Sequence, residues 1–324
     1  MNFERVTCEL VRALRGKRSQ AALSRRLKCR SNVIYAWESG SAFPTAARAM
    51  TLARLVGVEP RLALGRFYRR QPEWLAECDP ASREGVVRLL QDLRGRQPTV
   101  QLAASMGRNR YAVGRWLKGE TEPRLPDFLA LVEACSLRVL DFLSSFVDLE
   151  ALPTLAEQGR QLAAARQVAL EAPWSHAVLR ALELESYLAL PCHLPGWLAE
   201  RIGVTLAEEE RCLELLQSAG QITWQDDRWV TQSAPTLDFR GDRAATLSLA
   251  TWCAKLGAER LASEGPGQFA FNVFAVSAED AERLGELQRQ YFAELRAVVA
   301  ESRPASVLFV TNLQLFELGA REGR

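Results

Sequence analysis

Histidine is the scarcest residue in this sequence of 324 residues, which contains only His176 and His193. Histidine is the side chain used most often as a general base, and it is a common metal ligand. The GxxxxGKS/T, GxSxG and HExxH motifs are also absent, and the carboxylates fall on solvated helix faces. No set of residues fits acid–base or nucleophilic chemistry. We therefore expect that the protein is not an enzyme and has neither catalytic residues nor a cofactor.

Paired cysteines and long apolar runs are missing as well. The seven cysteines are scattered and form no CxxC motif, so we expect neither a metal site nor a disulfide framework but buried thiols, with a redox-sensing thiol as the alternative. No run of about 18 uncharged apolar residues occurs, and residues 1–18 lack the apolar centre of a signal peptide. We therefore expect a soluble, cytoplasmic protein that does not associate with a membrane.

Charge is distributed unevenly along the chain. Residues 1–150 contain 25 Lys or Arg and 16 Asp or Glu, a balance of +9, whereas residues 151–324 contain 16 and 23, a balance of −7. The formal net charge of +2 therefore conceals a basic half and an acidic half. This asymmetry is expected if only the first half meets the phosphates of a nucleic acid. The alternative is that its basic clusters are solvated helix faces.

One sequence pattern occurs twice, 79 positions apart. The first copy runs from Gln20 to Pro44 and the second from Thr99 to Pro123, and the match extends upstream through residues 10–17 and 89–96. At this offset the apolar, glycine and proline positions coincide: Leu23 with Leu102, Leu27 with Met106, Ile34 with Val113, Trp37 with Trp116, Gly40 with Gly119 and Pro44 with Pro123. The chain therefore contains two related modules.

Each copy predicts two short helices that meet at a tight turn. Leu23 and Leu27 share one helical face, a polar turn follows, and Ile34 and Trp37 form the inward face of the next helix. A glycine ends that helix, and a proline starts the next element. With the flanking helices, each module is predicted to be a bundle of about five helices. The alternative is a pair of helical hairpins that serve only for packing.

The two copies resemble the Cro/CI-like (XRE-type) helix-turn-helix regulators. The pattern of that family is a glutamine that opens the second helix, apolar residues at helical spacing, and tryptophan–glutamate–x–glycine before a proline. The first copy keeps Gln20, Trp37 and Glu38, whereas the second has Thr99 in the glutamine place and Leu117 in the glutamate place. The resemblance implies a phosphate contact at the glutamine place and a reading helix in the DNA major groove.

The exposed side of the second helix favours DNA binding over a packing role, because it concentrates hydrogen-bond donors. Arginine can grip guanine O6 and N7 as a fork, and arginine or tyrosine can hold phosphate. The candidate DNA-binding residues are Gln20, Arg30, Ser31, Asn32 and Tyr35 in the first copy, and Thr99, Asn109, Arg110, Tyr111 and Arg115 in the second.

A third pattern of short helices, over residues 174–233, is followed by a strand pair. The segments 176–190, 194–203 and 205–220 predict three helices, the last capped by Thr205, and 222–232 predicts a hairpin. This is the order of a winged helix. Because its reading helix would begin with three glutamates at 208–210, which phosphate repels, we expect a packing or dimerisation role there.

The last part of the chain predicts a helix over 242–263 and then two strands, at 268–277 and 305–318, around a long helix. The C-terminal 170 residues or so resemble an uncharacterised domain that follows a helix-turn-helix in one group of bacterial regulators, where a similar NLQLFEL-type ending closes the chain. Because a two-stranded half-sheet is marginal by itself, we expect its edge to pair with a second subunit.

These observations predict a mainly α protein with a smaller α+β C-terminal part. We expect two five-helix, lambda-repressor-like bundles, a winged-helix-like unit and a terminal strand–helix–strand unit. The predicted domains are 1–66 and 85–147 (helix-turn-helix), 67–84 (packed linker), 148–173 (helical connector), 174–235 (winged-helix-like) and 236–324 (dimerisation or regulatory).

The predicted function is a sequence-specific regulator of transcription, a repressor, that binds double-stranded DNA as a homodimer assembled through residues 151–324. The alternative is an antitoxin or adaptor. Such a protein would bind a protein partner through its acidic half and bind DNA only to regulate its own gene. A partner encoded beside the gene would favour the alternative.

Overall fold

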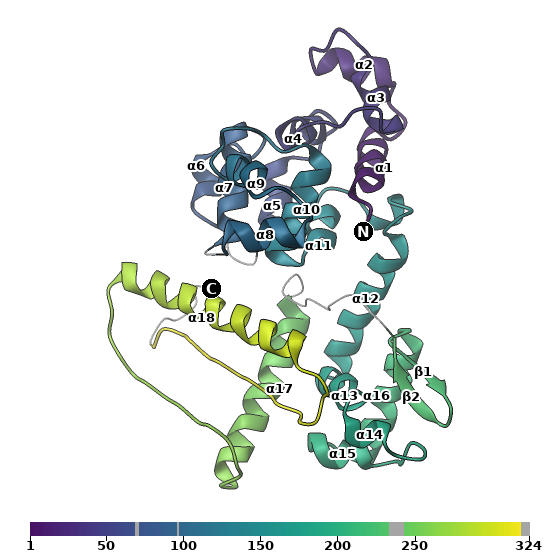
Figure 1. Ribbon diagram of the computed structural model, residues 1–324, viewed down its shortest axis with the longest axis vertical. Coiled ribbons are helices and arrows are strands. Elements are labelled where there is room, and N and C mark those ends of the chain that lie inside the picture. Colours follow the sequence, from purple (N-terminus) through teal and green to yellow (C-terminus); the bar gives the residue numbers. More distant parts are fainter. Residues whose placement is uncertain (69–70, 96, 233–242, 319–324) are drawn as a thin grey trace. The chain divides into compact units, whose positions relative to one another are not determined.

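The computed structural model describes residues 1–68, 71–95, 97–232 and 243–318 (Figure 1). In this part the chain is mainly helical, with one small antiparallel sheet, so the predicted fold class is confirmed. The chain divides into two compact units, with the described residues 1–163 in the first and 164–318 in the second. No described helix is long and apolar enough to cross a lipid bilayer. The predicted boundary at 235, residues 69–70 of the linker and residues 319–324 lie outside the described residues.

In the described part of the chain, each copy of the repeat folds into five helices, as predicted. The first copy contains α1 (Phe3–Arg15), α2 (Gln20–Arg26), α3 (Val33–Ser39), α4 (Ala46–Leu55) and α5 (Pro60–Phe67). The second contains α7 (Arg83–Arg94), α8 (Thr99–Ser105), α9 (Arg110–Leu117), α10 (Leu125–Ser136) and α11 (Val139–Ser144). One hydrophobic core extends through both copies, which makes them a single packed body.

Local signals explain where the helices of the repeat begin and end. The side chain of Asn32 caps α3, and that of Asn109 caps α9, by accepting a hydrogen bond from a backbone amide of the first turn. Gly40 (φ 77°) and Gly119 (φ 72°) follow α3 and α9 in the left-handed region, which side chains with a Cβ rarely adopt. A Cβ on Gly119 would also lie only 3.0 Å from a methyl group of Val87.

The aromatic linker between the copies packs onto this core, as its composition predicted. Leu75, in the short helix α6 (Trp74–Glu77), is buried, and the Arg61 guanidinium donates to the carbonyl of Leu75 and, at 2.7 Å, to that of Ala76. Arg54 pairs with Asp79 at 2.5 Å, and this hydrogen bond holds the pKa of the Asp79 carboxyl below its usual value.

η1 (Leu149–Ala151) and α12 (Ala156–Glu171) come next, and the division between the two units falls inside α12, after residue 163. The remaining elements belong to the second unit. It contains α13 (Ser175–Ala181), α14 (Glu185–Leu188), α15 (Trp197–Ile202), α16 (Leu206–Ser218), β1 (Ile222–Gln225), β2 (Arg228–Thr231), α17 (Arg243–Ala262) and α18 (Ala278–Glu301). The strands pair antiparallel, with Trp224 opposite Trp229, across a turn whose residues Asp226 and Asp227 both have positive φ. The single helix predicted over 176–190 is split into α13 and α14.

Three glutamates at the start of α16 were predicted to form a row of exposed carboxylates, and this prediction is wrong for one of them. Glu209 is buried, and its carboxylate accepts from the amides of Gly196 (3.0 Å) and Ala199 (2.5 Å) at the start of α15. Glu208 forms a capping box with Thr205. Glu209 therefore joins two helices, and the face that it was expected to present to solvent is not uniformly acidic.

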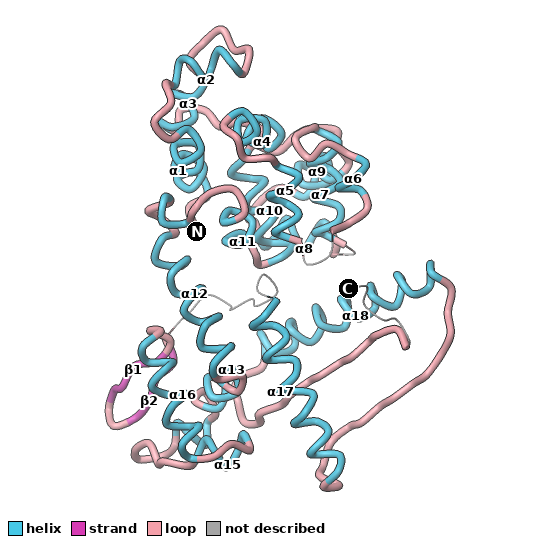
Figure 2. Tube along the Cα trace, turned by 180° about the vertical axis from the view of Figure 1, so that it is seen from behind, coloured by secondary structure: helices cyan, strands magenta, loops and turns pink. Residues whose placement is uncertain are grey.

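The two strands predicted around α18 are not formed within the described part of the chain. Residues 268–277 and 305–317 follow an extended course but belong to no β-ladder (Figure 2). The helices predicted between and before them are present as α18 and α17. Alternating apolar residues favour the extended conformation, but a strand also requires a neighbour to pair with.

Candidate functional site

The start of α3 presents the candidate residues of the first copy. Asn32 accepts hydrogen bonds from the amide of Tyr35 (3.3 Å) and from the Ser24 hydroxyl (3.0 Å), and that hydroxyl accepts from the amide of Ile34 (3.2 Å). Ser24 lies on α2, so these bonds fix the angle between the two helices. Arg30, Ser31, Asn32 and Tyr35 remain exposed beside the turn. The predicted residues of this copy, apart from Gln20, therefore form one surface.

The start of α9 presents the corresponding surface of the second copy, with a different arrangement. α9 begins at Arg110, two residues earlier than the repeat offset from α3 would give. The Arg110 guanidinium lies 4.8 Å from the centre of the Tyr111 ring and donates to its hydroxyl at 2.8 Å. Both side chains are exposed, as is Arg115 at the other end of the helix. Asn109, Arg110 and Tyr111 thus lie together, and Arg115, four residues after Tyr111, lies about one turn further along α9.

Basic side chains are engaged differently in the two copies. Arg25, Arg26, Lys28 and Arg30, which lie at the end of α2 and in the turn after it, are exposed. Among the described residues no carboxylate pairs with these four. In the second copy Arg108 pairs with Asp127 at 2.8 Å, and Arg115 lies 3.8 Å from Glu120. Near the turn, the first copy therefore has the greater excess of unneutralised positive charge.

Gln20, predicted to contact phosphate, is partly exposed and hydrogen-bonded within the first module. Its amide donates to the buried carboxylate of Glu38 at 2.5 Å, and the same carboxylate accepts from Arg15 at 2.5 and 3.3 Å. Gln20 therefore joins the start of α2 to the end of α3. At the equivalent positions of the second copy, Thr99 and Leu117 cannot form this network, and Arg94 donates instead to the carbonyl of Gln97 at 2.7 Å.

The two copies are related by an approximate two-fold axis. The amide of Ala46 donates to the carbonyl of Pro123 at 3.3 Å, and the amide of Leu125 donates to that of Pro44 at 2.8 Å. The repeat offset converts the first of these bonds into the second with the copies exchanged. Helix contacts follow the same rule, since α1 packs against α10 and α7 packs against α4. Such reciprocity defines an isologous interface, here within one chain.

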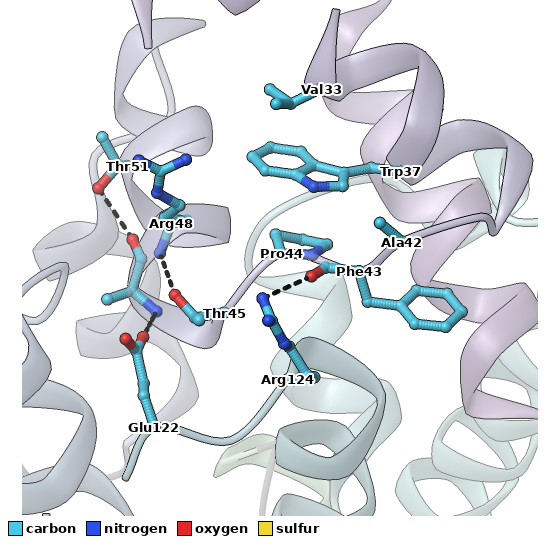
Figure 3. Close-up of a pocket in the computed structure, with 11 residues that line it drawn as sticks. Val33, Trp37, Ala42, Phe43, Pro44, Thr45, Arg48, Thr51, Glu122 and Arg124 are labelled. Carbon is cyan, nitrogen blue, oxygen red and sulfur yellow. Dashed lines mark hydrogen bonds between the residues drawn. The ribbon is translucent and has the colours of Figure 1, made fainter. Parts of the chain in front are cut away.

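A cavity of about 390 Å³ lies at this junction (Figure 3). Trp37 and Val33 of α3 form one wall, and Arg48, Glu122 and Arg124 supply its charged groups. The Glu122 carboxylate accepts from the amide of Ala47 at 2.9 Å, and Arg124 donates to the carbonyl of Phe43 at 3.1 Å. Glu122 and Arg124 thus bind backbone of the first copy, so the cavity lies within the contact between the copies.

Two features of this site were not singled out from the sequence. One is Ser24, which links α2 to α3 in the first copy and is replaced by alanine at position 103. The other is the network of Arg15, Gln20 and Glu38, whose side chains are distant in sequence. The sequence did point to partners for Glu38. It follows Trp37, the inward residue of a short helix, and a carboxylate that is buried there needs hydrogen-bond partners.

Comparison with known proteins identifies a family for the C-terminal half of the chain. A family model described as "Domain of unknown function (DUF4423)" matches residues 156–318. No curated protein and no solved structure matches the chain. Across the described residues, no group of three or more His, Cys, Asp or Glu is arranged to hold a metal ion.

Proposed function

This chain belongs to the DUF4423 family, a domain of unknown function, and we propose that its N-terminal unit binds double-stranded DNA in a sequence-specific way. In this proposal the protein regulates transcription in the cytoplasm of a bacterium, as a repressor, and has no catalytic role. The two copies of the repeat are the reading modules, with α3 and α9 in the major groove.

One observation carries the proposal: donors gather on the exposed starts of two helices that a two-fold axis relates. Arg30, Ser31 and Tyr35 project from one module, and Arg110 and Tyr111 from the other. Arginine forks match guanine, and hydroxyl groups reach either bases or phosphates. A module made only for packing has no reason to expose these groups at the same place twice.

The two-fold relation sets the form of the DNA site. Modules related by a two-fold axis meet the duplex in opposite directions, so the two half-sites are inverted, about one helical turn or 34 Å apart. The half-sites differ in sequence, because Ser31 and Asn32 stand where the second copy has Arg110 and Tyr111. One chain protects roughly 15 to 20 base pairs, and a dimer of the chain, with four reading helices, protects about 30 to 40.

Electrophoretic mobility shift with the promoter region of the protein's own gene tests the proposal. We expect a specific complex whose affinity falls steeply as salt rises, because bound arginines and lysines displace counterions from the phosphates. Footprinting then measures the length of the site. Equal binding to promoter DNA and to unrelated DNA would contradict sequence-specific reading, and no binding would favour the protein-partner alternative.

Arginine substitutions identify the reading residues. Arg110→Ala and Arg115→Ala should each weaken specific binding by about 1 to 3 kcal/mol, because each removes a contact to a base or a phosphate. Arg211→Ala is the matched control, since this exposed arginine lies in the second unit. Fluorescence anisotropy measures the three affinities, and circular dichroism checks that the helices persist. If neither Arg110→Ala nor Arg115→Ala differs from the control, α9 does not read DNA.

A further inference from the structure

Two extended segments of the second unit expose more apolar surface than a monomer usually does. We define them as the first arm, residues 268–276, before α18, and the second arm, residues 305–317, after it. Phe271 is 97% exposed, Phe309 84% and Phe316 70%. These three rings alone expose on the order of 500 Å², since an aromatic side chain has roughly 150 to 250 Å² to bury.

The exposed area is that of an interface. The largest apolar patch on a typical monomer is about 300 to 600 Å², and a standard protein interface buries about 800 Å² on each partner. Beyond the three rings, Val273 and Val276 of the first arm and Val307, Leu313 and Leu315 of the second are also exposed. Together with the three rings, these side chains raise the exposed apolar area of the arms from that of a monomer patch to that of a dimer interface.

Among the residues that the structure describes, the backbone of the arms forms no β-ladder. In the described part of the chain, the second arm is held at its start, where the carbonyl of Ala305 accepts from the amide of Glu185 at 2.8 Å and Leu308 packs on the core of the unit. Beyond Leu308, the carbonyl of Leu313 accepts from the Gln288 side chain at 3.4 Å. The first arm makes no described backbone ladder. Extended segments with open amides and carbonyls are templates for strand pairing.

The composition of the arms selects the occupant. The arms are rich in phenylalanine, valine and leucine, with apolar residues on both faces, and their one charged side chain is Glu317 at the end of the second arm. Apart from that terminal carboxylate, a partner recognised through charge has nothing to bind there. Another apolar, uncharged strand fits, and a second copy of this chain supplies two of them without like-charge repulsion.

Two-fold symmetry explains why the proposed assembly stops at two copies. One copy has two arms and α18, which is too little for a stable sheet, whereas two copies give four strands and two helices to cover a face. α18 exposes Leu287, Tyr291, Val298 and Val299, which supply apolar surface for that purpose. A two-fold dimer uses the same surface on both subunits, so this contact is satisfied at two copies.

We propose that the first and second arms are the dimerisation surface of this chain and pair as β-strands with the arms of a second copy. This assembly does not depend on whether the N-terminal unit binds DNA. It narrows the expected homodimer contact from residues 151–324 to two segments of nine and thirteen residues.

Sedimentation and hydrogen exchange of the full chain, without DNA, test the proposal. The wild type should sediment at micromolar concentration as a dimer, twice the chain mass of 36.1 kDa. Every second amide between Phe269 and Val276, those that donate across the ladder, should exchange slowly, and dilution to the monomer should make them exchange fast. Slow exchange in a monomer would overturn the proposal, since it would show pairing within one chain, and so would a wild-type monomer with fast exchange.

Charged substitutions locate the contact. Phe271→Asp with Phe309→Asp should convert the dimer to a monomer and abolish the slow exchange, while Leu62→Asp, at an exposed leucine of the first unit, should leave the dimer intact. Circular dichroism establishes that the double variant keeps its helices. If it fails to fold, Phe271→Ser with Phe309→Ser is the milder pair, with weakened dimerisation as the expected result. A dimer that persists in the folded variants, with fast exchange in the arms, would place the contact elsewhere and overturn the proposal.

Discussion

Replacing Glu38 with leucine, the residue that the second copy carries at position 117, tests how the first module is held together. The Glu38 carboxylate is buried and accepts hydrogen bonds from Arg15 and Gln20. Leucine removes the carboxylate and leaves the guanidinium of Arg15 without its counter-charge. The perturbation therefore combines the loss of an ion pair with the loss of the bond between α2 and α3.

The expected loss of stability depends on how many hydrogen bonds the Arg15 guanidinium keeps. Breaking a buried ion pair by removing one partner costs about 3 to 5 kcal/mol. The Arg15 side chain is 21% exposed and still donates to the carbonyls of Gly16 (2.9 Å) and Arg18 (3.0 Å), which places the cost at the lower end. We therefore expect a loss of about 3 kcal/mol for Glu38→Leu, or roughly 6 to 12 °C in Tm for a unit of this size.

Thermal unfolding followed by circular dichroism measures the loss, and hydrogen exchange of α1 to α3 assigns it to the first module. Glu120→Gln is the control, because Glu120 is exposed and contacts Arg115 and Lys118 only at 3.8 and 4.0 Å. It should change stability by less than about 0.5 kcal/mol. Adding Arg15→Leu to Glu38→Leu should recover about 1 to 2 kcal/mol, since no charge is then left unpaired. If Glu38→Leu matched Glu120→Gln, the network would not stabilise the module.

The helices of the repeat were predictable because their signals are local. Apolar spacing, an asparagine cap and a glycine stop all lie within one helix and its ends. The earlier start of α9 follows from the same rule, since Asn109 rather than the residue equivalent to Asn32 provides the cap. The two-fold contact between the copies had no such signal, because the carbonyls of Pro44 and Pro123 accept from backbone amides, which every sequence possesses.

The errors in the second unit have physical causes. The glutamates at 208–210 were interpreted as one charged row, although helical periodicity places Glu209 with Cys212, Leu213 and Leu216, which are buried. Consecutive residues on a helix point in different directions, so that error was avoidable. That the strands predicted at 268–277 and 305–318 form no ladder in the described part of the chain was not predictable, because alternation fixes which residues share a face but not which strand lies alongside.

Two further predictions concern the tryptophans of the repeat and a histidine of the second unit. Trp37 is 4% exposed and Trp116 only partly buried, so Trp37→Ala should cost about 3 to 5 kcal/mol and Trp116→Ala at least 1 kcal/mol less; equal losses in urea unfolding would contradict this difference in burial. His193 tests pH dependence in the second unit. Burial lowers the pKa of His193 more than the nearby Glu209 raises it, so the folded state binds a proton less readily than the unfolded chain. Its contribution to stability is therefore complete above about pH 6.5, the value of an unperturbed histidine, and is lost as pH falls below it, by at most about 1.4 kcal/mol per pH unit. His193→Asn should flatten this part of the pH profile of Tm while His176 is retained in both proteins, and a variant that loses stability with acid as steeply as the wild type would show that His193 is not the group that titrates.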